Sequence, residues 1–122
     1  MKTLLALVAL VSLVGCGEHS ATETPGAGCT DNAIPAITVT IVDALTSQPI
    51  PGGALVIARD GAYADTAAGQ PPLYFMAYER SGTYSVSVAS PGYRPWNLEG
   101  LVVMRDRCHV KTVPLAARLM VL

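Results

Sequence analysis

Cys108 and His109 place a thiol next to an imidazole, a pair of groups that can perform nucleophilic catalysis. A thiolate nucleophile needs a base within hydrogen-bonding distance of its sulfur. Consecutive side chains of an extended strand point to opposite faces, so these two side chains should not meet if the segment is a strand. We therefore interpret His109 as an exposed strand residue and predict no catalytic residue and no enzymatic activity.

Metal and glycosidase chemistry have no better support. Two distant cysteines and one nearby histidine fall short of four ligands, and no CxxC or HxxxH spacing occurs, so we predict neither a metal ion nor a cofactor. A glycosidase needs two carboxylates across a cleft. Asp60, Asp65 and Glu79 are available, but no motif places them. The alternative function, a small envelope hydrolase acting on a polymer, requires some of Asp60, Asp65, Glu79 and His109 to converge on a pocket.

Aromatic side chains are the better candidates for binding. Tyr93 and Trp96 flank Arg94 and Pro95, directly after the turn residues Ser90-Pro91-Gly92. Exposed rings in loops often contact sugars or protein partners. The competing interpretation, which we favour for Trp96, is that a lone tryptophan covers the core of a small domain. Tyr93, Arg94 and Trp96 are the predicted binding residues.

Charge excludes two classes of partner. The chain has 8 basic and 9 acidic residues and a net charge of −1. Nucleic-acid binding needs a basic field that displaces counterions from phosphates, and a polybasic membrane patch needs clustered lysine and arginine. We expect neither.

The first residues are typical of an export signal. Lys2 precedes an apolar run from Leu4 to Val14, which is shorter than the roughly 20 residues of a membrane-spanning helix. The sequence Leu13-Val14-Gly15-Cys16 resembles the lipobox of bacterial lipoproteins. The resemblance implies cleavage before Cys16, diacylglycerol on its thiol and an acylated amino group. The alternative is an ordinary secretory leader with an incidental cysteine. Gly17 after the cysteine resembles outer-membrane sorting in Gram-negative cells, so we expect an outer-membrane lipoprotein of the cell envelope.

The two remaining cysteines and the polar stretch after Cys16 indicate how the rest of the chain is divided. Residues 1–15 are the predicted signal peptide, 16–28 the lipidated cysteine with a Gly-, Thr- and Pro-rich tether, and 29–122 one folded domain. Cys29 and Cys108 form an even pair in an oxidising compartment, and we predict a disulfide between them. Two unrelated free thiols are the alternative.

Short β-type runs separated by turn residues predict an all-β sandwich. Residues 37–42 and 83–89 alternate apolar and polar side chains most clearly. Asp60-Gly61 indicates a two-residue hairpin. The expected strands cover residues 37–42, 54–59, 62–66, 73–79, 83–89, 101–104 and 109–119.

Two segments together resemble carboxypeptidase regulatory-like domains. The first is the strand 37–43, followed by Thr46-Ser47-Gln48-Pro49-Ile50 and Gly53-Ala54; the second is Gly82-Thr83-Tyr84-Ser85-Val86-Ser87-Val88 with Pro91-Gly92-Tyr93. The resemblance covers about residues 36–119 and implies a seven-stranded, prealbumin-like β-sandwich without catalytic activity of its own. One departure is Ser47, where the family usually carries glycine, so the type of that turn is open.

These features predict a membrane-anchored, non-enzymatic lipoprotein that binds a protein or glycan partner or supports an envelope assembly. A subunit of a larger envelope complex is a further alternative, and it would present an exposed apolar patch or a long unpaired strand edge.

Overall fold

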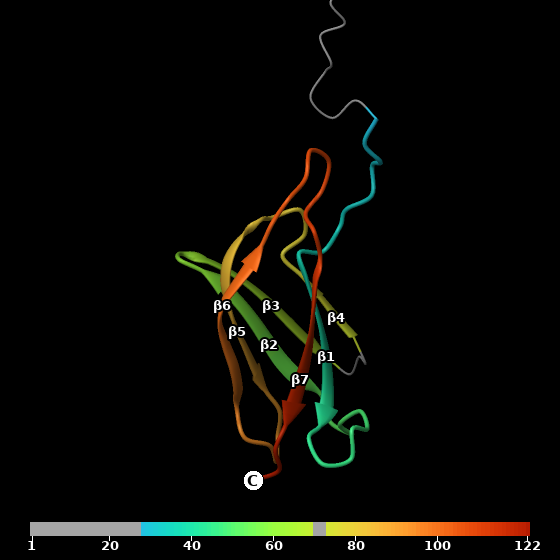
Figure 1. Ribbon diagram of the computed structural model, residues 1–122. Helices are drawn as coiled ribbons and strands as arrows, with labels where there is room; N and C mark the ends of the chain where they lie inside the picture. Colours follow the sequence, from blue (N-terminus) through green and yellow to red (C-terminus); the bar gives the residue numbers. More distant parts are fainter. Residues whose placement is uncertain (1–27, 70–72) are drawn as a thin grey trace, which may run out of the picture.

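The computed structural model describes residues 28–69 and 73–122, which form seven strands in two packed sheets (Figure 1). The all-β prediction is therefore confirmed. A three-stranded sheet has the order β4-β1-β7 and a four-stranded sheet the order β3-β2-β5-β6. The strands are β1 (Ile37–Asp43), β2 (Ala54–Asp60), β3 (Tyr63–Gly69), β4 (Leu73–Met76), β5 (Gly82–Ala89), β6 (Trp96–Val103) and β7 (Val113–Leu119).

The core lies between the inner faces of the two sheets. In β1, Ile37, Val39 and Ile41 are buried, while Thr38 and Thr40 are only partly covered. Strand β5 has the same pattern, because Tyr84, Val86 and Val88 alternate with partly exposed serines. Alternation therefore predicted both strands correctly. The largest fully buried side chains are Tyr84, Ile37, Met76, Leu119, Val39, Val56, Val86 and Val88.

The first and last strands lie side by side. β1 pairs with β7 in parallel along its whole length, from Ile37 opposite Val113 to Asp43 opposite Leu119. β1 also pairs with β4, and the strands of the larger sheet pair with one another; all of these pairings are antiparallel. Seven consecutive pairs between β1 and β7 thus join the two ends of the domain within one sheet.

Besides the start of β6, three predicted strand boundaries were wrong by three residues or more. β4 ends at Met76 rather than Glu79, because Ala77 and Glu79 both have φ of 54°, in the left-handed region that a strand does not contain. β7 begins at Val113 rather than His109, since residues 104–112 form a hairpin connection. β3 continues to Gly69, three residues beyond the expected end.

β6 was the largest error, because it begins at Trp96 and not at Leu101. Pro95 directly precedes the strand. A bulge interrupts the pairing with β5, so that Leu98 lies opposite Val86 and Leu101 opposite Tyr84. Gly100 supplies the positive φ of 70° at this bulge. The inward-facing residues Leu98 and Leu101 are therefore three positions apart, whereas inward residues of a regular strand are two apart.

The β1–β2 connection keeps a glycine-like conformation without glycine. Ser47 has a φ of 59°, and the Asp43 carboxylate accepts hydrogen bonds from the backbone N–H groups of Leu45 and Thr46. Arg118 donates to the Ser47 hydroxyl at 2.7 Å. These contacts hold a serine where the resembling family usually has glycine.

The sandwich has two ends (Figure 1). We call the end with the Cys29–Cys108 bond, the β4–β5 loop and the β6–β7 hairpin the disulfide end. The opposite end, with the β1–β2 and β5–β6 connections and the last residues of the chain, is the groove end. No helix within residues 28–69 and 73–122 is long and apolar enough to cross a membrane.

Candidate functional site

The disulfide end holds the segment that leads into the domain. Cys29 and Cys108 are bonded, with 5.3 Å between their Cα atoms, as the pairing of the two remaining cysteines predicted. Thr112 donates from its hydroxyl to the Pro35 carbonyl at 2.6 Å, and Glu79 donates its backbone N–H to the Ile34 carbonyl at 2.8 Å. The predicted leader, Cys16 and the tether up to residue 27 lie outside the described residues.

Asp106 shapes the hairpin that presents Cys108 and His109. Its carboxylate accepts the backbone N–H groups of both residues at 2.8 and 2.9 Å, and its own N–H donates to the His109 carbonyl. These bonds hold the pKa of Asp106 below its ordinary value of 3.8. Since this segment is a turn, the expected placement of Cys108 and His109 on opposite faces of a strand is wrong. Both side chains face the entering segment, where they contact Cys29 and Thr30 respectively.

His109 bridges a hydroxyl and a carboxylate. Its Nδ1 lies 2.6 Å from Oε1 of Glu79, and its Nε2 lies 3.0 Å from Oγ1 of Thr30. Glu79 Oε1 also accepts the backbone N–H of Ile34 at 2.8 Å, which lowers the pKa of Glu79, with the imidazole contributing in the same direction. The side chain of His109 is 21% exposed, so the expectation of an exposed strand residue is incorrect.

The other two carboxylates of the hydrolase alternative lie elsewhere at this end. Asp65 accepts the backbone N–H of Ala77 at 2.8 Å and so fixes one left-handed residue of the β4–β5 loop. Asp60 pairs with Arg80 at 2.9 Å and lines a hollow of about 310 Å³ on the larger sheet. Of these four candidate residues, only Glu79 and His109 contact each other among the interactions of the described residues.

A tyrosine and an arginine complete the support of this loop. The Tyr84 ring is buried, and its hydroxyl donates to the Arg80 carbonyl at 2.6 Å. The Arg80 guanidinium lies 3.9 Å above the centre of the Tyr63 ring, where the ring attracts the cation. The loop that carries Glu79 is therefore fixed on both sides of that residue.

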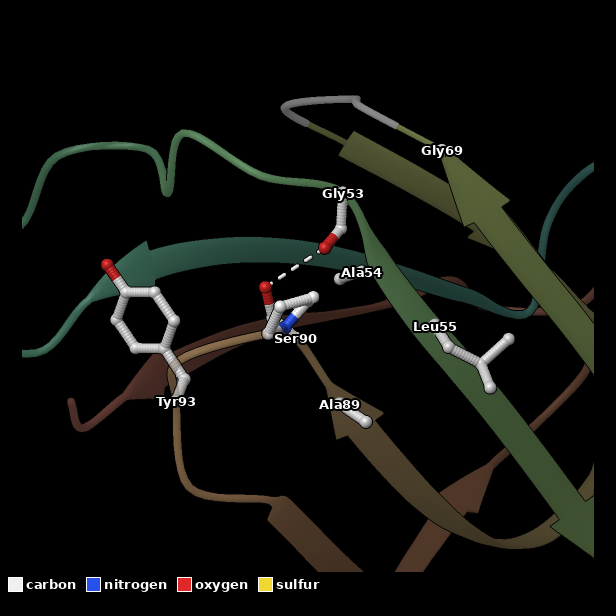
Figure 2. Close-up of a pocket in the computed structure, with 8 residues that line it drawn as sticks. Gly53, Ala54, Leu55, Gly69, Ala89, Ser90 and Tyr93 are labelled. Carbon is white, nitrogen blue, oxygen red and sulfur yellow. Dashed lines mark hydrogen bonds between the residues drawn. The ribbon is translucent and has the colours of Figure 1, made fainter. Parts of the chain in front are cut away.

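A groove of about 430 Å³ opens at the opposite end (Figure 2). The Tyr93 ring stands on one side, Leu55 and Ala89 lie on the other, and a hydrogen bond of 2.9 Å from Ser90 to the Gly53 carbonyl crosses between them. None of the residues that line it is charged: they are Gly53, Ala54, Leu55, Gly69, Ala89, Ser90, Pro91 and Tyr93. Its volume falls in the range typical of small-ligand sites.

The predicted binding residues separate in the structure. Tyr93 lines the groove, and its hydroxyl donates to Asp43 at 3.1 Å, an arrangement in which burial and the carboxylate raise the pKa of the phenol. Arg94 is exposed and is not among the lining residues. Trp96 begins β6 opposite the buried Val88 and packs, half-buried, against the core. The small residues of the groove floor carried no sequence signal, because glycine, alanine and serine also occur in most of the other described turns.

Comparison of the chain with known proteins found no relative, because no family model and no curated protein matches it. Within residues 28–69 and 73–122, no cluster of three or more histidine, cysteine, aspartate or glutamate side chains is arranged to hold a metal ion. Functional arguments therefore depend on the residues of the chain itself.

Acid should destabilise the domain through Asp43, Glu79 and Asp106, three of the carboxylates that accept hydrogen bonds from backbone N–H groups. Their pKa values are lowered in the folded state, so their contribution is present above the unfolded pKa and is lost as pH falls through the folded pKa. The free energy of unfolding should fall progressively below about pH 5. Urea unfolding between pH 6 and 2.5 measures this, and Glu79→Gln should flatten the curve. Because these hydrogen bonds are short-range, 0.5 M NaCl should leave the dependence in place; a flat profile would contradict the argument.

Proposed function

We propose that this chain is a lipid-anchored protein of the bacterial cell envelope, whose carboxypeptidase regulatory-like β-sandwich binds a protein or glycan partner at the groove end. Binding, rather than catalysis, is the role of that groove. The observation that carries the proposal is the position of the groove at the end opposite Gly28, the residue through which the chain reaches Cys16.

The two ends support different tasks. Lipid on Cys16 would hold the disulfide end toward the bilayer, since residues 17–28 join the lipidated residue to that end. The groove would then face away from the membrane. A tether of this length, fully extended, spans about 40 Å, which lets the groove reach partners beyond the lipid headgroups.

The chemistry of the groove favours a neutral partner. Its walls are the Tyr93 ring and the side chains of Leu55 and Ala89, and the Ser90 hydroxyl and Gly53 carbonyl between them already bond to each other. An aromatic ring held by a second contact loses little side-chain entropy when it packs against a ligand. Neutral sugar rings and uncharged peptide side chains match this surface.

Site-specific photocrosslinking in intact cells tests the proposal. A photoreactive amino acid at Pro91, an exposed residue of the groove, should give discrete envelope adducts. The same amino acid at Arg105, which is exposed at the disulfide end, should not give those adducts.

A matched pair of charge substitutions provides the control. Ala89 and Ala116 are both exposed strand positions, but only Ala89 lines the groove. Ala89→Glu places a charge in a neutral groove and should reduce the Pro91 adducts at least about 10-fold, which corresponds to 1.4 kcal/mol. Ala116→Glu should leave them unchanged. Equal adducts in both variants would refute the groove as the binding site.

A further inference from the structure

Thr30, His109 and Glu79 form a continuous hydrogen-bonded series at the disulfide end. The distances are 3.0 Å from the hydroxyl oxygen to Nε2 and 2.6 Å from Nδ1 to the carboxylate oxygen. The three residues come from the entering segment, the β6–β7 hairpin and the β4–β5 loop, so tertiary structure alone assembles them. Thr30 is exposed, whereas Glu79 and His109 are partly buried.

The surroundings fix which ring nitrogen carries the proton. Glu79 Oε1 accepts the Ile34 N–H, and the lowered pKa keeps this carboxylate ionised near neutral pH. An ionised carboxylate accepts a hydrogen bond, so Nδ1 must be the donor. In a neutral imidazole, Nε2 then has the free lone pair, and the Thr30 hydroxyl donates its proton to it.

We propose that His109 acts as a general base for the Thr30 hydroxyl, which is a nucleophile toward carboxylic esters. A hydroxyl is a weak nucleophile until an adjacent base removes its proton, and a third group that orients the base completes the arrangement. Glu79 is the orienting residue. This activity goes beyond the proposed binding function and uses the opposite end of the sandwich.

The reaction is an acyl transfer. Thr30 Oγ1 attacks the ester carbonyl carbon, and its proton moves to Nε2 of His109. The bond between the carbonyl carbon and the leaving oxygen then breaks, and Nε2 returns the proton to the departing alcohol. Thr30 then carries the acyl group until water attacks its carbonyl carbon and passes a proton to Nε2. The bond between that carbon and Thr30 Oγ1 breaks, the carboxylic acid leaves, and Nε2 returns the proton to Oγ1.

Ester-linked acyl chains at the membrane surface are the substrate class that the location favours. This identification rests on the proposed anchor at Cys16, because the anchor would hold Thr30 at the end of the domain nearest the bilayer. The reactivity of the Thr30 hydroxyl depends only on the side chains of Thr30, His109 and Glu79. The nucleophile and the lipid anchor can therefore be refuted separately.

The purified mature protein should be exposed to p-nitrophenyl acetate, and peptide mass spectrometry should follow acetylation at each threonine. Thr30 should be acetylated at least about 100-fold faster than Thr112, an exposed threonine at the same end whose hydroxyl donates to a backbone carbonyl instead of an imidazole. His109→Gln removes the base and should lower the Thr30 rate by about the same factor. Thr30→Ser keeps a hydroxyl at this position and should retain the fast acetylation.

Equal acetylation of Thr30 and Thr112, or an unchanged Thr30 rate in His109→Gln, would overturn the proposal. Circular dichroism and the intact Cys29–Cys108 bond would show that His109→Gln remains folded. If that variant unfolds, the comparison of Thr30 with Thr112 in the wild-type protein still decides the question. If the protein carries no lipid but Thr30 is still acetylated rapidly, the proposed nucleophile stands. Only the assignment of membrane esters as its substrate is then refuted.

Discussion

Substitution of Cys16 by alanine should reduce palmitate incorporation to background and abolish cleavage before residue 16. The sequence Leu13-Val14-Gly15-Cys16 offers one thiol at the end of the apolar run, and no other residue there can form the thioether. Each buried methylene of an acyl chain contributes about 0.8 kcal/mol, and one chain alone gives only reversible binding, so several chains are needed for stable attachment. Metabolic labelling and the mass of the processed N-terminus measure the effect.

The control for this experiment is Ser12→Ala, a change within the leader that keeps its apolar character and all four residues of the lipobox. It should be labelled and processed like the wild type. A Cys16→Ala protein that is still cleaved at the same bond and remains equally membrane-bound would contradict the lipid anchor, and with it the assignment of the disulfide end to the bilayer side.

Removal of the Cys29–Cys108 disulfide should lower the free energy of unfolding by about 4 kcal/mol. The bond closes a loop of about 80 residues. In the chain-entropy description, the conformational freedom that the unfolded chain loses by this closure is worth about 4 kcal/mol. A domain of this size buries only about two-thirds of its unfolded surface, so the loss is a large part of its total stability. For about 100 residues the midpoint of thermal unfolding should fall by roughly 20 °C.

Urea and thermal unfolding of the Cys29→Ser/Cys108→Ser variant measure this loss. Dithiothreitol should destabilise the wild-type protein to a similar extent and should have no effect on the double variant. Equal midpoints for the wild type with and without reductant would mean that the bond adds no stability. A decrease much larger than predicted would instead indicate that the contacts of Thr30 and Ile34 depend on the bond.

The strands predicted most directly are those whose side chains alternate without interruption. Ile37, Val39 and Ile41 in β1 and Tyr84, Val86 and Val88 in β5 are of this kind. β2, whose sequence does not alternate, was predicted from its apolar run and the Asp60-Gly61 turn that follows it. The first half of β6 was missed because the bulge at Gly100 changes the spacing of inward residues. The end of β4 was missed because Ala77 and Glu79 adopt left-handed conformations that their residue types do not favour.

The candidate sites were predicted less completely than the fold. The two cysteines left after Cys16 is assigned to the lipid indicated the disulfide. The turn after β5 drew attention to Tyr93, which lines the groove. By contrast, the contacts of His109 join residues separated by 79 and 30 positions. Such contacts depend on how the loops fold over the end of the sandwich, and local periodicity contains no information about them.

The parallel pair of β1 and β7 has a mechanical consequence. If the protein is held by its lipid at one end and by a partner in the groove at the other, tension runs along the strands. The covalent bond between Cys29 and Cys108 divides this tension between β1 and β7 at the point where it enters the domain. Rupture would then require many hydrogen bonds to shear at once, whereas without the bond β1 would bear the pull alone.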